Sequence, residues 1–181
     1  EPKGKYELGE IGKTALSFGF MPQLREIAKG RLFEDVMPSC FFGQEFFCNV
    51  VYIHFANTKV FKERLPVVIE NIHKLGVEEV IFLHDECYAA FTSLAPAYGM
   101  EVPFKSVHYF EYLYNRLTAL KDLITPLNVK VVYPRPCSNR LCGDSHFFVR
   151  KILDRIGATL VQRTYQDETA LCCGSIFRAM Y

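Results

Sequence analysis

The chain has 181 residues, of which 50% are hydrophobic and 23% are charged, and its formal net charge is +1. A chain of this length and composition buries a core without disulfide bridges. Its basic and acidic residues are interleaved, which argues against nucleic-acid partners. The most apolar stretch, Phe46 to Phe55, is far shorter than the run of about 18 residues that crosses a bilayer, so no membrane span is expected.

Seven cysteines occur in a sequence without secretory features. An odd number of cysteines in such a chain predicts a reducing, cytoplasmic environment, where they serve metal or redox chemistry more often than structural bridges. The chain starts at Glu1 without Met and stops at Tyr181, eight residues after a cysteine pair, so we expect a fragment of a longer protein.

The first half of the chain predicts alternating strands and helices. Residues 1–20 read as an arm or loop, Met21–Lys29 as a short helix, and the β-branched run Val50–Ile53 as a strand. A helix capped at Asn57 or Thr58 is expected to reach Lys74, since apolar residues recur there at helical spacing. The continuous apolar run Glu79–Leu83 predicts a buried strand, and a helix follows to about Tyr98.

The second half repeats this theme. After an extended Glu101–Lys105 and a further helix, a strand is expected at Lys130–Tyr133, a helix from near Asp144 to Ile156, and a strand at Thr159–Gln162. The fold class is therefore α/β, with mainly parallel sheet and flanking helices. Cys87 and Cys137 follow two of these strands, at the sheet edge where α/β proteins bind ligands, so the cysteines can converge.

The cysteine pair before Gly174 indicates metal binding. Two neighbouring thiolates suit a cluster of several irons, whereas a single zinc needs only one of the pair, with Cys87, Cys137 and His84 completing four ligands. Spacing alone leaves both open. His84 also reads as a proton donor to a leaving thiolate or as an ordinary loop residue. Arg135, Arg140 and Arg178 either lower the pKa of nearby thiols or form a solvated face.

The remaining cysteines have simpler readings. Cys48, beside Phe46 and Phe47, is expected to be a small buried hydrophobe, and Cys40 leans towards a structural role. Cys142 is equally compatible with a structural and a ligand role.

The order strand, Pro-x-Pro-Cys, helix, strand, Leu-Cys-Cys-Gly, preceded by a strand and Cys-Tyr, resembles the cysteine-rich CCG domain of heterodisulfide reductase and of related iron–sulfur oxidoreductase subunits. The resemblance covers roughly residues 37–181 and implies two pseudo-repeated βαβ modules after an arm and short helix at 1–36. The first module, 37–125, is degenerate: Cys40 takes the pair's position, and His84 to Cys87 match the closing motif with His for its first Cys. The second, 126–181, supplies Cys137, Cys172 and Cys173 and lacks its closing motif.

By this resemblance the chain is an iron–sulfur oxidoreductase subunit with a cysteine-ligated cluster, of the non-cubane [4Fe–4S] kind, held by Cys137, Cys172, Cys173 and Cys87, with Cys40 and His84 as further candidates. The implied partners are a flavoprotein or ferredoxin-like subunit and a small thiol or disulfide. No catalytic residue is assigned. Because the motifs are incomplete, a second hypothesis stays open, a non-catalytic scaffold subunit with a zinc ion or no metal. A thiol-redox protein cycling Cys172 and Cys173 is a third reading.

Overall fold

The computed structural model describes residues 7–19, 21–26 and 28–174, without the side chains of residues 7, 8 and 22. The chain forms two compact units, Glu1–Tyr109 and Phe110–Tyr181. The boundary falls inside a helix, α5 (Tyr109–Ala119). The three segments expected from the sequence, 1–36, 37–125 and 126–181, stay a prediction.

The first unit is built on a five-stranded sheet with the strand order β1-β3-β2-β4-β5. All neighbouring strands are parallel except β1 and β3. The register sets Ser17 beside Phe82 and Phe82 beside His108, so three strands end at one level. The strands are β1 (Glu7–Leu8), β2 (Thr14–Ser17), β3 (Cys40–Phe42), β4 (Glu79–Phe82) and β5 (Lys105–His108).

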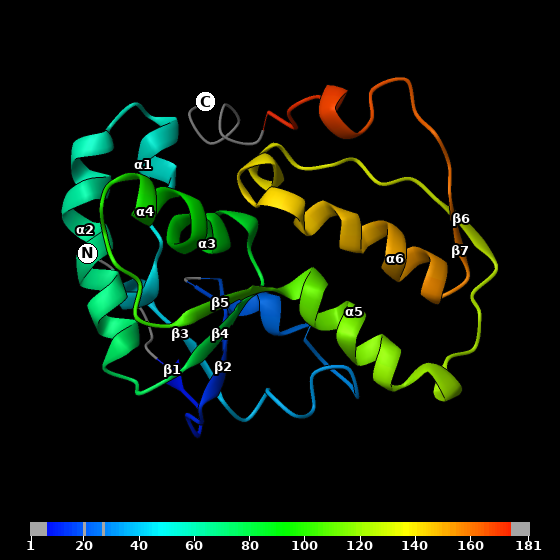
Figure 1. Cartoon of the computed structure of the whole chain (residues 1–181), viewed down its shortest axis with the longest axis horizontal. Helices are drawn as coiled ribbons and strands as arrows, with labels where there is room; N and C mark the ends of the chain where they lie inside the picture. The colour runs from blue at the N-terminus through cyan, green and yellow to red at the C-terminus, as the bar shows by residue number, and fades with distance from the viewer. Residues whose placement is uncertain (1–6, 20, 27, 175–181) are drawn as a thin grey trace. The chain divides into compact units, whose positions relative to one another are not determined.

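Helices of the first unit pack with the sheet around one hydrophobic core (Figure 1). As the sequence predicts, Asn57 caps the longest of them, because its Oδ1 accepts a hydrogen bond of 3.3 Å from the backbone N–H of Val60. The apolar face of this helix, including Phe61 and Leu65, packs in the same core as Val80 of β4. The helices are α1 (Val51–His54), α2 (Thr58–His73), α3 (Asp85–Ala89), the π-helical turn η3 (Ala90–Leu94) and α4 (Ala95–Ala97), with 3-10 turns η1 (Pro22–Glu26) and η2 (Gln44–Phe46).

Two local predictions are wrong. Residues 7–8 and 14–17, expected in an arm or loop, form the strands β1 and β2, and Ala15 and Leu16 of β2 are fully buried. With only these two apolar residues between Thr14 and Ser17, β2 lacks the continuous apolar run that indicates a buried strand. Val50–Ile53, expected as a strand, gives the helical turn α1 instead, because a four-residue apolar run carries no period that separates helix from strand.

The second unit contains a small parallel sheet of two strands, β6 (Val129–Val131) and β7 (Ala158–Leu160). The helix α6 (Phe147–Arg155) connects them, which makes a βαβ unit. The other elements are the 3-10 turns η4 (Lys121–Leu123), η5 (Cys137–Leu141), η6 (Gly143–His146) and η7 (Asp167–Thr169), besides most of α5. Parallel strands with helical connections in both units confirm the predicted α/β class.

Candidate functional site

Two cysteines that lie 35 positions apart in the sequence meet in the second unit. Cys137 is the first residue of η5, after the extended Pro136, and Cys172 lies just beyond η7. Their Sγ atoms are 3.9 Å apart, and both side chains are exposed. The neighbouring Cys173 is exposed too. The second unit thus brings the thiols of Cys137 and Cys172 together at its surface.

Two arginines hold this arrangement together. Arg135 precedes Cys137, is 5% exposed, and forms an ion pair with the carboxylate of Glu168. Arg140 follows Cys137 and donates hydrogen bonds of 3.2 and 2.5 Å to the carbonyl oxygens of Glu168 and Ala170. Planar guanidinium groups are suited to such multiple contacts. The two arginines therefore fasten the Cys137 turn to the segment that leads into Cys172.

A buried polar network fixes the shape of the Cys137 turn. Asn139 is fully buried. Its Oδ1 accepts a hydrogen bond of 3.2 Å from Arg135 Nε, and its side-chain NH₂ group donates a hydrogen bond of 3.1 Å to the hydroxyl of Ser145. Buried polar groups with satisfied hydrogen bonds give a site one well-defined geometry. The buried hydrogen bonds of Asn139 therefore fix the backbone of this turn, while the Cys137 side chain is exposed.

The sulfur geometry fits metal ligation. Two thiolates on one tetrahedral ion with metal–sulfur bonds of about 2.3 Å lie about 3.8 Å apart, close to the 3.9 Å between Cys137 and Cys172. Gly174 has a φ of +71°, a left-handed backbone conformation that favours glycine. Its backbone N–H donates a hydrogen bond of 3.4 Å to Cys172 Sγ. An N–H bond to sulfur stabilises a bound thiolate.

The pKa of Cys137 is raised above the ordinary 9.0. The largest cause is partial loss of hydration, followed by the hydrogen bond and charge of Cys172, with a smaller contribution from Cys173. The predicted lowering of thiol pKa by arginines is therefore wrong at Cys137. Arg135 and Arg140 are occupied by Glu168 and by backbone carbonyl oxygens, and Arg178 lies outside the described residues. The Cys137 thiol therefore keeps its proton more readily than an ordinary cysteine does.

The sequence His84 to Cys87 lies at the carboxyl end of β4 in the first unit. Cys87, 3% exposed, contacts His84 Nδ1 at 3.7 Å and shares a hydrogen bond with Cys48, which is 1% exposed. A Cβ added to Gly19 would approach Cys87 Sγ to 3.2 Å, so the thiol is tightly enclosed. The burial expected for Cys48 is confirmed.

Burial and the Cys48 neighbour raise the pKa of Cys87 well above 9.0, with the Cys48 hydrogen bond as the largest cause. We expect the free energy of unfolding to fall as pH rises above about 9, by about 1.4 kcal/mol per pH unit for this group, because the unfolded thiol ionises there and the folded one does not. Urea unfolding of wild type and Cys87→Ala from pH 7 to 10 measures this. Equal slopes in both proteins would contradict it.

Sequence reasoning missed a buried pair in the first unit. His108, the last residue of β5, is 1% exposed and lies 2.7 Å from the carboxylate of Asp85, the first residue of α3. His108 packs edge-on against Tyr88 and stacks on Tyr109. Asp85 and His108 each offer one atom that could ligate a metal ion. The available signal was their position after adjacent parallel strands, at one sheet edge.

The predicted site residues therefore fall into two groups. Cys137 and Cys172 are brought together in the second unit, with Cys173 close enough to affect the pKa of Cys137. Cys87, His84 and Cys40 belong to the first unit. Cys40 begins β3, is 4% exposed, and has the Arg25 guanidinium 3.8 Å from its Sγ. This burial agrees with a structural role for Cys40, and both this role and its alternative role as a ligand stay predictions. The roles predicted for Cys87 and His84 as ligands stay predictions.

No protein family, curated protein or solved structure matches this chain. Within the described part of the chain, no helix has the length and apolar character needed to cross a membrane.

Proposed function

We propose that this chain is an iron–sulfur oxidoreductase subunit in which Cys137, Cys172 and Cys173 hold a metal centre. The observation that supports the proposal best is the 3.9 Å separation of Cys137 Sγ and Cys172 Sγ. Thiolates are the soft ligands that iron–sulfur clusters and zinc take. A function in a reducing cytoplasm agrees with this proposal, since the seven cysteines, all within the described residues, form no disulfide bridge.

The residues around the sulfurs have separable tasks in this proposal. Arg135 and Arg140 position Cys137 against the segment before Cys172, and Gly174 donates to the Cys172 sulfur. A bound cluster supplies one-electron transfer, at a potential set by sulfur hydrogen bonds and solvent exposure. The exposed thiols make the centre accessible to a flavoprotein or ferredoxin-like partner, or to a small thiol or disulfide.

A zinc-binding scaffold is the second candidate. Its support is the same distance, because 3.9 Å suits two thiolates on one tetrahedral ion. Zinc is redox-inactive, so in that case the centre would fasten the two segments and transfer no electrons.

Metal analysis separates the two candidates. We expect protein purified without oxygen and reconstituted with iron and sulfide to contain about four irons per chain, the content of a [4Fe–4S] cluster, and to give an electron paramagnetic resonance signal. Stoichiometric zinc that iron does not replace would support the scaffold instead. Protein that retains neither metal would overturn both candidates.

A further inference from the structure

A second feature of the second unit lies beyond β7 and involves no cysteine. A cavity of about 380 Å³ opens there, between the loop after the strand and the helix α6. The carboxyl end of a parallel strand is the usual ligand position in α/β proteins, and this volume is at the small end of ligand pockets. Leu160 is the one apolar residue of its lining, so the occupant is a polar molecule.

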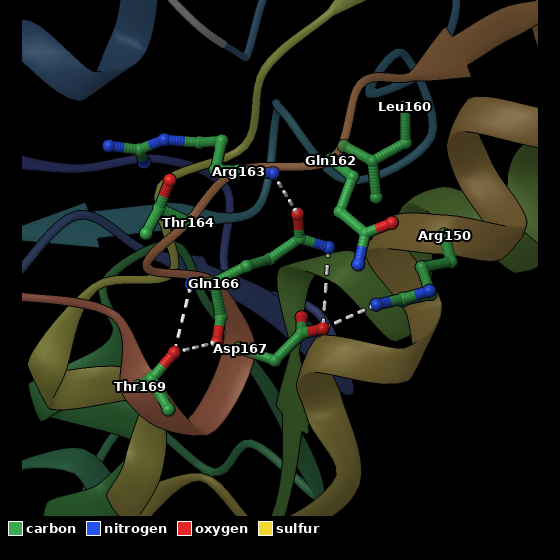
Figure 2. A pocket seen from close by; sticks show the side chains of 8 residues that line it. All are labelled: Arg150, Leu160, Gln162, Arg163, Thr164, Gln166, Asp167 and Thr169. Atoms are coloured by element: carbon green, nitrogen blue, oxygen red, sulfur yellow. Dashed lines mark hydrogen bonds and ion pairs between the residues drawn. The ribbon is translucent and has the colours of Figure 1, made fainter.

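The side chains in the cavity favour negative charge. Its titratable residues are two arginines, Arg150 and Arg163, and one acid, Asp167, which leaves a net charge of +1. Figure 2 shows the guanidinium of Arg150 and the amide of Gln162 pointing towards Asp167, while the guanidinium of Arg163 points away from them. Arg150 pairs with Asp167 at 2.5 Å, with side chains 51% and 36% exposed. Exposed pairs are weak, so an incoming oxyanion can compete for this guanidinium.

Hydrogen bonds within the chain shape one wall of the cavity. Gln166 and Thr169 form a capping box. In addition to its capping bond of 3.1 Å from the backbone N–H of Gln166, the Thr169 hydroxyl donates a hydrogen bond of 2.9 Å to the carbonyl oxygen of Gln166 (Figure 2). The side-chain Oε1 of Gln166 also accepts a hydrogen bond of 2.9 Å from the backbone N–H of Arg163. Asp167 is held at a φ of +51°, a left-handed conformation uncommon for a residue other than glycine. Strained backbone of this kind is concentrated at binding and catalytic sites.

We propose that this cavity binds a small polar molecule through an oxyanion, a carboxylate or a phosphate, received by Arg150 and by the amide of Gln162. A guanidinium presents donors in a fork that matches both groups. Arg163 contributes a second positive charge to the cavity lining, and Asp167 restrains Arg150 until the anion replaces its carboxylate. The proposal is independent of whether Cys137 and Cys172 hold a metal.

Isothermal titration calorimetry of the full chain with inorganic phosphate and with acetate, at constant ionic strength set by chloride, tests this. We expect saturable binding of at least one of the two anions. The anion that binds more tightly shows whether the natural ligand offers a phosphate or a carboxylate. Arg150→Gln should weaken it about tenfold or more, or about 1.4 kcal/mol. Asp167→Asn should strengthen it several-fold by releasing Arg150, whereas a site for a cation would respond in the opposite sense.

Lys130→Gln, which removes a charge on β6 outside the cavity, is the matched control and should leave the affinity unchanged. Circular dichroism confirms that each variant is folded. The proposal would be overturned if neither anion bound saturably. It would also be overturned if Lys130→Gln lowered the anion affinity as much as Arg150→Gln does, or if Asp167→Asn bound the anion more weakly than wild type.

Discussion

Cys172→Ser is expected to abolish the metal centre. Loss of one sulfur ligand should lower metal affinity by more than the 10–100-fold that removing an outer partner of a ligand costs, and the iron signal should disappear. The side chain is exposed, so the free energy of unfolding should change by less than about 0.5 kcal/mol. Metal content per chain and urea unfolding measure the two effects separately.

The control for this variant is Cys40→Ala. Cys40 is buried in β3 beside Arg25, so its removal should leave the metal content unchanged even where it lowers stability. Full metal loading of Cys172→Ser, or loss of the metal in Cys40→Ala, would contradict the assignment of the centre to the second unit.

Arg135→Met should both destabilise the protein and loosen the thiol site. The guanidinium is 5% exposed, and its removal leaves the Oδ1 of buried Asn139 without this donor and Glu168 without its ion pair. An unsatisfied buried polar group costs about 1–3 kcal/mol, so we expect the free energy of unfolding to fall by about 2–3 kcal/mol. Because Arg135 positions Cys137 against Cys172, affinity for Cd²⁺ should fall as well, by about tenfold or more.

The matched control is Arg163→Met, which removes an exposed guanidinium from the same unit. Surface substitutions of this kind change stability by less than about 0.5 kcal/mol, and we expect the Cd²⁺ affinity to stay as in wild type. Urea unfolding and Cd²⁺ titration under folding conditions give both readings. Arg135→Met with wild-type stability and Cd²⁺ affinity would show that the two segments are held together by other contacts.

Local patterns predicted those elements whose signals lie within a few residues. The apolar face of α2 and its Asn57 cap could be read directly, because helical spacing and a capping side chain are properties of one short segment. The strand β4 was equally clear from its continuous apolar run. In contrast, β2 has only two apolar residues, Ala15 and Leu16, and became recognisable as a strand only between two partners, β3 and β4.

Sequence patterns were enough to predict the α/β class and the place of Cys87 after the strand β4. Which side chains contact one another depends on the tertiary structure. It paired Cys137 with Cys172 through two arginines, enclosed Cys87 with Cys48, and set His108 against Asp85. The reason is physical: periodicity and capping act over a few residues, whereas these contacts join segments 23 to 39 positions apart, whose distance depends on how strands pair and helices pack.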